Sequence, residues 1–191
     1  MTGRTHDLAA FSLLNWIFVT NPIREMSLAT GVVVMGANFI GGLAPDLDET
    51  TAGLWSKLPA GSIVGRIMSP LLGAHRLISH SLLGLVLAGW GVNYLLSAIS
   101  NVLIVDMSLV WWSFMIGFFS HLLVDSLTRD GVPWLFPIPL RIGFPPFRFM
   151  RMKTSGILEK SFIFPGLLLF NWWLVYHNHT KYLDFFQHHI K

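Results

Sequence analysis

Five apolar segments dominate this chain and restrict the folds that are open to it. They cover residues 8–20, 26–43, 82–99, 108–127 and 160–176. Four have roughly the 17 to 25 residues with which an α-helix spans a bilayer, whereas the first has only about 13. Only 12% of the residues are charged, about half the share of a typical soluble domain. The sequence therefore predicts an all-α, polytopic membrane bundle of about five membrane helices, one of them short, with residues 1–191 forming a single domain.

The chain contains no cysteine, which excludes both a disulfide framework and a thiolate metal site. A metal ion would have to be bound by His, Asp and Glu, and these ligands suit Zn, Mn or Fe better than Cu(I). The net charge is only +3. We interpret the basic residues as signals of membrane topology and expect no nucleic-acid partner.

The basic residues are unevenly divided between the two ends of the predicted spans. If each segment crosses the membrane or enters most of it, the N-terminus and the loops 44–81 and 128–159 lie on one side. This side carries 10 of the 13 Lys and Arg residues. Positively charged loops stay in the cytoplasm, so we expect this side at the cytoplasmic face of a bacterial or archaeal inner membrane.

The same side collects ionisable residues that are typical metal ligands. His121 and Asp125 end the fourth segment and are four residues apart, so on a helix they share one face, about one turn apart. The other candidates stand at the ends of neighbouring segments: His6, Asp46, Asp48, His75, His80 and Glu159. Ionisable groups beside lipid are costly and indicate a function, although His121 and Asp125 could also hydrogen-bond as a contact between helices.

Metal ions held by His and carboxylate side chains are typical of hydrolytic sites. They lower the pKa of a bound water, and they bind the attacking and leaving oxygen atoms when one group displaces another at phosphorus. Asp48 is a candidate to orient or deprotonate that water, and the planar guanidinium of Arg76 is suited to a phosphate. Each residue also has a simpler interpretation. Asp48 could lie in a solvated acidic loop that ends a helix, and Arg76 could anchor the chain at the membrane surface. At a membrane boundary the substrate would be a lipid phosphoester.

Residues 134–153 interleave aromatic and basic side chains with prolines, and repeated prolines argue against a helix. We expect a short irregular hairpin at the membrane surface. Its side chains either rest on anionic headgroups or form an aromatic belt.

The ordered motifs of the chain resemble the YdjM-like family of inner-membrane proteins, which are regarded as metal-dependent hydrolases. The resemblance rests on His6, Pro45-Asp46-Leu47-Asp48, His75-Arg76 with His80-Ser81, Ser120-His121 with Asp125, and Gly131-Val132-Pro133. That family is similar to the zinc-dependent phospholipases C and S1/P1 nucleases. This similarity implies a phospholipase C-like helical core with two or three ions, zinc first among them. The implied ligands are His6, Asp46, His75, His80, His121, Asp125 and Glu159, with Asp48 as a ligand or the water-orienting base.

We therefore expect a membrane-bound, metal-dependent hydrolase that contacts membrane lipids and acts on a lipid phosphoester. The alternative is a non-catalytic membrane protein that binds a regulator or moves metal ions. A transporter should carry ionisable residues near the middle of its spans. Here only neutral amides such as Asn15, Asn38, Asn93 and Asn171 occupy those positions.

Overall fold

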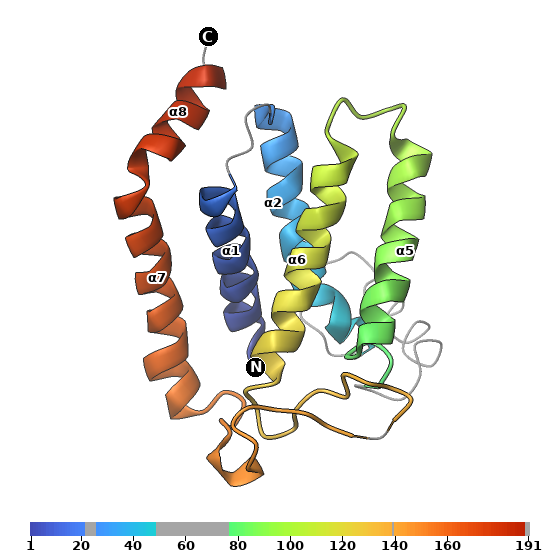
Figure 1. Cartoon of the computed structure of the whole chain (residues 1–191), viewed down its shortest axis with the longest axis vertical. Coiled ribbons are helices and arrows are strands. Elements are labelled where there is room, and N and C mark those ends of the chain that lie inside the picture. The colour runs from blue at the N-terminus through green and yellow to red at the C-terminus, as the bar shows by residue number, and fades with distance from the viewer. Residues whose placement is uncertain (22–25, 49–76, 139, 190–191) are drawn as a thin grey trace, which may run out of the picture.

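The structure is a computed structural model, and it describes residues 1–21, 26–48, 77–138 and 140–189. The main helices run side by side along the molecule (Figure 1): α1 Gly3–Thr20, α2 Leu28–Leu43, α5 Leu82–Ile99, α6 Met107–Asp125, α7 Phe164–His177 and α8 His179–His189. Three short elements join them: the 3-10 helices η1 Ala44–Asp48 and η2 Arg148–Met150, and the π-helix η3 Glu159–Ile163. No strand occurs in the described ranges, so the prediction of an all-α fold is confirmed.

Three helical segments are long and apolar enough to cross a membrane: Leu28–Leu47, Leu82–Ile99 and Met107–Asp125. At a rise of about 1.5 Å per residue each is close to the 30 Å thickness of the hydrocarbon core. α1 begins at Gly3, before the apolar segment, so its first turns are polar. α7 is preceded by a π-helical turn. Neither is among the three, and a total of about five spans stays a prediction.

α2 and α6 form the centre of the bundle, and their backbones touch. A Cβ at Gly41 would lie 2.1 Å from the carbonyl oxygen of Phe114, and one at Gly117 would lie 2.1 Å from that of Asn38. The Asn38 side chain donates a hydrogen bond to the Ser113 carbonyl at 3.1 Å across the same interface. Small residues and buried amides are the usual means by which membrane helices associate. These contacts set the α2–α6 spacing.

The remaining helices surround this pair. α5 packs on α6, while α1 packs on α2, α6 and α7. Asn15 of α1 donates to the Asn171 side chain of α7 at 3.0 Å, and Asn171 donates to Ser12 at 2.6 Å. Of the amides predicted for the middle of the spans, Asn15, Asn38 and Asn171 are thus buried contacts between helices, whereas Asn93 on α5 is exposed.

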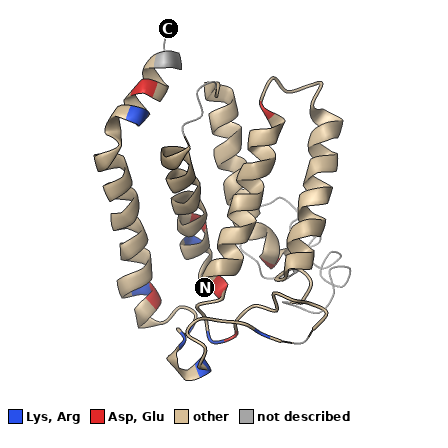
Figure 2. Cartoon of the chain, viewed as in Figure 1, with Lys and Arg blue, Asp and Glu red and all other residues tan. Residues whose placement is uncertain are grey.

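The chain between α6 and α7 folds across the lower end of the bundle in Figure 1, where the N-terminus also lies. An antiparallel bridge joins Val132 to Ile142, and a parallel bridge joins Thr128 to Met152. The expected irregular hairpin is confirmed. Charged side chains gather mainly at this lower end (Figure 2).

Candidate metal centre

Four predicted ligands converge where α2, α5 and α6 meet. Asp46 comes from η1, His80 precedes Ser81, the N-cap of α5, and His121 and Asp125 lie one turn apart on α6. The Nε2 atom of His80 lies 3.3 Å from Asp46 Oδ1, 3.3 Å from His121 Nε2 and 3.6 Å from Asp125 Oδ2. The Nε2 atom of His121 lies 3.5 Å from Asp46 Oδ1 and 3.7 Å from Asp125 Oδ2.

Two groups of three side chains have ligand atoms close enough to share a metal ion: His80, His121 and Asp125 form one group, and His6, Asp46 and His121 form the other. An ion bound at about 2.0–2.1 Å by four ligands needs ligand atoms roughly 3.3 Å apart. Five pairs among the four atoms lie between 3.3 and 3.7 Å. The cluster can therefore hold a metal ion.

Local structure presents each group to the cluster. Pro45 is the second residue of η1 and directly precedes Asp46. The hydroxyl of Ser81 accepts the backbone N–H of Gly84 at 3.1 Å and caps α5, which fixes His80 at the entrance of that helix. A polar side chain at the N-cap satisfies an otherwise unpaired helical N–H.

Hydrogen bonds outside the cluster orient both imidazoles. His121 Nδ1 donates to the Gly42 carbonyl at 2.7 Å, and His80 Nδ1 lies 3.0 Å from the Ser79 hydroxyl. A carbonyl only accepts, so in the neutral ring of His121 the Nε2 atom carries a lone pair. This lone pair faces a second ring nitrogen and two carboxylates. Such a group of acceptors requires a cation, either a metal ion or a proton. A histidine whose second ring nitrogen donates to a backbone carbonyl, as in His121, is typical of metal-bound histidines.

His6 outlines a second position, because its ligand atom lies within 4.8 Å of those of Asp46 and His121. Its Nε2 atom is 3.4 Å from Asp125 Oδ1, whereas the first position uses Oδ2. The His6 ring stacks on His121 with centroids 3.7 Å apart. Its Nδ1 atom is buried and has no hydrogen-bond partner among the described residues. Asp125 could thus bridge two ions. The Met1 amino group also lies 2.6 Å from Asp125 Oδ1.

Burial is uneven around the cluster. The side chains of His80, His121 and Asp125 are at most 3% exposed, whereas that of Asp46 is 24% exposed. Because Asp46 is the most exposed member, the cluster opens toward η1.

Glu159 does not join the cluster. One carboxylate oxygen accepts hydrogen bonds from the Thr2 N–H, the Thr2 hydroxyl and the Thr5 hydroxyl at 2.7–2.8 Å, and the other accepts the Ser155 N–H at 2.8 Å. Burial alone would raise the pKa of Glu159, but these donors outweigh it and lower the pKa to about 2. Its oxygens are therefore occupied, and Glu159 anchors the first turn of α1, which carries His6.

Three other predicted residues are not placed. His75 and Arg76 lie outside the described residues, and Asp48 ends η1 with a side chain that also lies outside them. Their assignment as a metal ligand, a phosphate-binding residue and a water-orienting residue stays a prediction.

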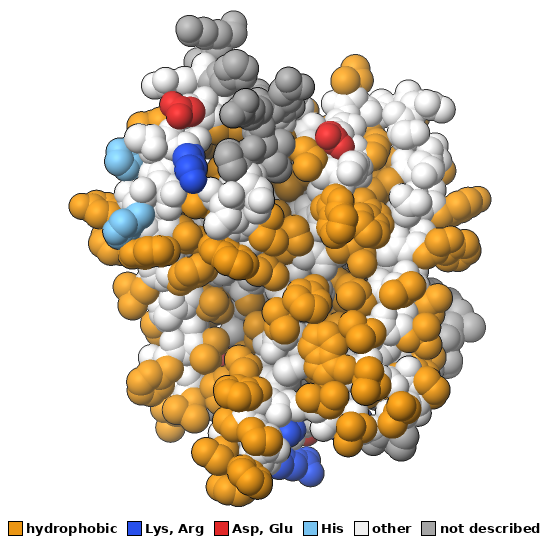
Figure 3. Space-filling view, in the orientation of Figure 1, with side chains coloured by type: hydrophobic (Ala, Val, Ile, Leu, Met, Phe, Trp, Pro, Cys, Tyr) orange, Lys and Arg blue, Asp and Glu red, His pale blue; other side chains and the backbone are white. Residues whose placement is uncertain are grey.

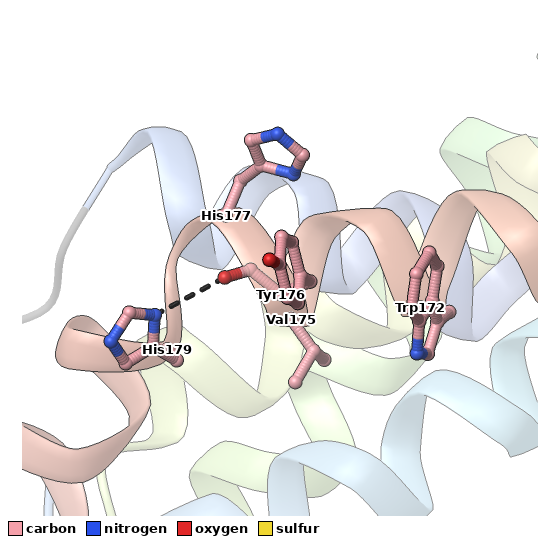
Figure 4. A pocket seen from close by; sticks show the side chains of 5 residues that line it. All are labelled: Trp172, Val175, Tyr176, His177 and His179. Carbon is pink, nitrogen blue, oxygen red and sulfur yellow. Dashed lines mark hydrogen bonds between the residues drawn. The ribbon is translucent and has the colours of Figure 1, made fainter.

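The residues around a shallow pocket on α7 are unrelated to the cluster. Trp172, Val175, Tyr176, His177 and His179 line it (Figure 4). His179 Nδ1 donates to the Tyr176 carbonyl at 3.1 Å. The pocket lies toward the opposite end of the bundle from the cluster.

The contacts that support the cluster were not foreseen from the sequence. The carbonyl of Gly42 and the hydroxyl of Ser79 orient two of the imidazoles. Ser79 had a weak signal, because it directly precedes a candidate ligand. Gly42 had none, because its role depends on how α2 packs against α6.

Fold and cluster together define an α-helical protein with three helices apolar enough to cross a membrane and a buried His/Asp group that could hold a metal. Residues 1–181 match the family described as YdjM inner membrane protein, and the chain belongs to this family. It is also similar to "Uncharacterized protein YvsG" of Bacillus subtilis (strain 168), with 29% identity over 172 residues, which cover 88% of this chain and 91% of that protein. No solved structure matches the chain.

Proposed function

We propose that this YdjM-family protein is a membrane-bound, metal-dependent hydrolase that cleaves a phosphoester of a lipid. The observation that supports the proposal is the set of four ligand atoms, 3.3–3.7 Å apart in the pairs measured, at one end of the apolar helices. Hydrolytic metal sites use His and carboxylate ligands of this kind. The end of a span is also where a lipid headgroup would meet the site.

Two positions share Asp125 in the proposed centre. Asp46, His80, His121 and one oxygen of Asp125 would hold the first ion. His6 and the other oxygen of Asp125 would contribute to the second. When bound, such ions supply an activated water and neutralise charge on a phosphoryl group. Zinc is the first candidate, because imidazole and carboxylate ligands at near-tetrahedral spacing suit it better than ions that prefer six oxygens.

The residues around this centre would hold and orient rather than react. The Gly42 carbonyl keeps the His121 proton on Nδ1 and leaves Nε2 available as a ligand. Glu159 holds the N-terminal turn, and therefore His6, beside Asp125. Substrate would approach over Asp46, which is the most exposed of the four ligands to the first position.

A non-catalytic role for the metal is the second candidate, and one observation favours it. If Asp46 joined His80, His121 and Asp125 around one ion, these protein ligands would close its shell, and closed shells are typical of structural zinc sites. Three of the four side chains are also nearly inaccessible. In this case the ion would only join η1, α5 and α6.

A comparison of zinc-loaded variants separates the two candidates. Protein in nanodiscs would be incubated with lipid phosphomonoesters and phosphodiesters, and products would be measured by mass spectrometry. Hydrolase activity predicts product with the native chain and with the control Asp184→Asn on exposed α8, and none with Asp125→Asn. Asp48→Asn should keep its zinc and lose product. Zinc that raises the Tm without product from any lipid would favour the structural role.

A further inference from the structure

The layer that closes the lower end of the bundle carries an unusual combination of side chains. We define the interfacial layer as residues 128–138 and 140–158. Its exposed apolar residues include Phe144, Phe147, Phe149 and Ile157, and the last two are 78% and 81% exposed. Apolar side chains presented so openly indicate contact with another apolar phase.

Hydrogen bonds to the neighbouring helices and within the layer hold the interfacial layer in place. Phe144 donates its N–H to the Ser126 carbonyl at 2.8 Å, and Leu82 at the start of α5 donates to the Trp134 carbonyl at 3.1 Å. The Arg151 guanidinium donates to the carbonyls of residues 145 and 146 at 2.7 and 2.8 Å. Val132 is fully buried against α6. The layer is thus a fixed platform: Trp134 packs against the bundle, whereas Phe144, Phe147 and Phe149 stay exposed.

The charge of the layer is strongly one-sided. Its sequence contains five basic residues and one acidic residue, Asp130. Arg148 lies 3.6 Å from Asp130, but both are well exposed and such pairs are weak. Arg129, Arg141 and Lys153 are exposed and make no ion pair with any residue that the structure describes. Figure 3 shows basic side chains at the lower end, next to apolar ones.

The depth of the layer follows from the helices above it. α6 ends at Asp125 and α5 begins at Leu82, and both helices are candidate spans. Residues just beyond the ends of a span lie at the level of the lipid headgroups. Aromatic side chains reaching outward from this level can enter the leaflet, and basic ones can meet phosphate groups.

From these observations we propose that the interfacial layer binds anionic phospholipid headgroups and inserts its aromatic side chains into the leaflet on which the His/Asp cluster opens. The occupant is a lipid leaflet because the basic residues alternate with exposed apolar ones. A nucleic acid would satisfy the charges only. The inference is independent of the proposed hydrolase activity.

The test uses single-cysteine variants, since the chain contains no cysteine. A nitroxide at Phe149→Cys would be examined in vesicles of phosphatidylcholine alone and of an equimolar mixture with phosphatidylglycerol. Accessibility to oxygen relative to a water-soluble nickel chelate reports its depth. We expect a membrane-inserted label that lies deeper in the mixed vesicles. Ile104→Cys is the matched control: it is 98% exposed, lies between α5 and α6, and should show no dependence on composition.

The charge dependence has its own variant. Arg141→Gln with Lys153→Gln should reduce the ratio of phosphatidylglycerol to phosphatidylcholine retained on the purified protein, by about fivefold for each charge removed. Both side chains are exposed, so the Tm should not change. A label at residue 149 that is fully accessible to the nickel chelate in both vesicles would overturn the proposal. Equal depth in both vesicles, with unchanged lipid retention, would also overturn it and leave only an aromatic belt.

Discussion

The close contact between α2 and α6 predicts that one added methyl group will damage both the bundle and the cluster. In Gly117→Ala the new Cβ would lie 2.1 Å from the Asn38 carbonyl oxygen and 2.8 Å from the Gly42 nitrogen. Ordinary contacts of a carbon atom are about 3.5 Å, so the helices must separate by roughly 1 Å. That shift stretches the 2.7 Å hydrogen bond from His121 to Gly42.

The expected cost combines two effects. Overpacking costs about 1–3 kcal/mol, and the lost hydrogen bond adds about 1 kcal/mol. A loss of about 2–4 kcal/mol corresponds to a Tm about 4–16 °C lower for a chain of this size. Because Gly42 orients His121, zinc affinity should also fall by about 10–100-fold.

The assay is thermal unfolding in detergent, followed by tryptophan fluorescence, together with a zinc titration. Gly36→Ala on α2 is the matched control, since nothing lies within 4 Å of a Cβ built there. It should leave the Tm unchanged or slightly higher, because Ala favours helix over Gly by up to about 1 kcal/mol. If Gly117→Ala behaved like this control in both measurements, the close packing of α2 against α6 would be refuted.

Three further predictions concern the surroundings of the cluster. Glu159→Gln should cost about 1–3 kcal/mol at neutral pH. The pKa of Glu159 is lowered from 4.5 to about 2, so the native chain should lose this stabilisation as the pH falls from 4.5 toward 2. The Tm of the variant should vary less with pH in that range. An equal dependence of Tm on pH in the two proteins would contradict the role of Glu159. Asn171→Ala leaves the Asn15 amide without its acceptor and should accelerate hydrogen exchange in α7, and unchanged exchange would count against that contact. Arg151→Lys removes the planar guanidinium donors and should accelerate hydrogen exchange in residues 143–152 without affecting zinc binding. Loss of zinc in this variant would show that the layer and the cluster are coupled.

The helices and much of the cluster could be predicted because the signals are local. The length of an apolar run indicates a span, and the spacing of His121 and Asp125 places them on one helical face. Asp46 and His80 were found because they directly follow or precede apolar segments. The number of predicted crossings then placed these residues at the same end of the bundle.

The atomic arrangement could not be predicted, because it depends on how the helices pack. Glu159 is 157 residues from Thr2, and no local sequence pattern predicts that the first turn of α1 will donate hydrogen bonds to its carboxylate. The role of Gly42 needs the backbone contact of α2 with α6. An acidic residue at a helix start looks the same in sequence whether it binds a metal or hydrogen-bond donors. The number of ions likewise depends on which oxygen of Asp125 faces which imidazole.

The most direct test of the proposed centre is the metal content of the detergent-purified chain, measured by mass spectrometry after loading with zinc. The account predicts bound zinc in the native protein and in the control Asp184→Asn, and its loss in His121→Ala and Asp125→Asn, with all four proteins recovered from the membrane. If the native chain bound no zinc, manganese or iron under these conditions, protonated histidines would be the cations between Asp46 and Asp125. That result would contradict the metal centre.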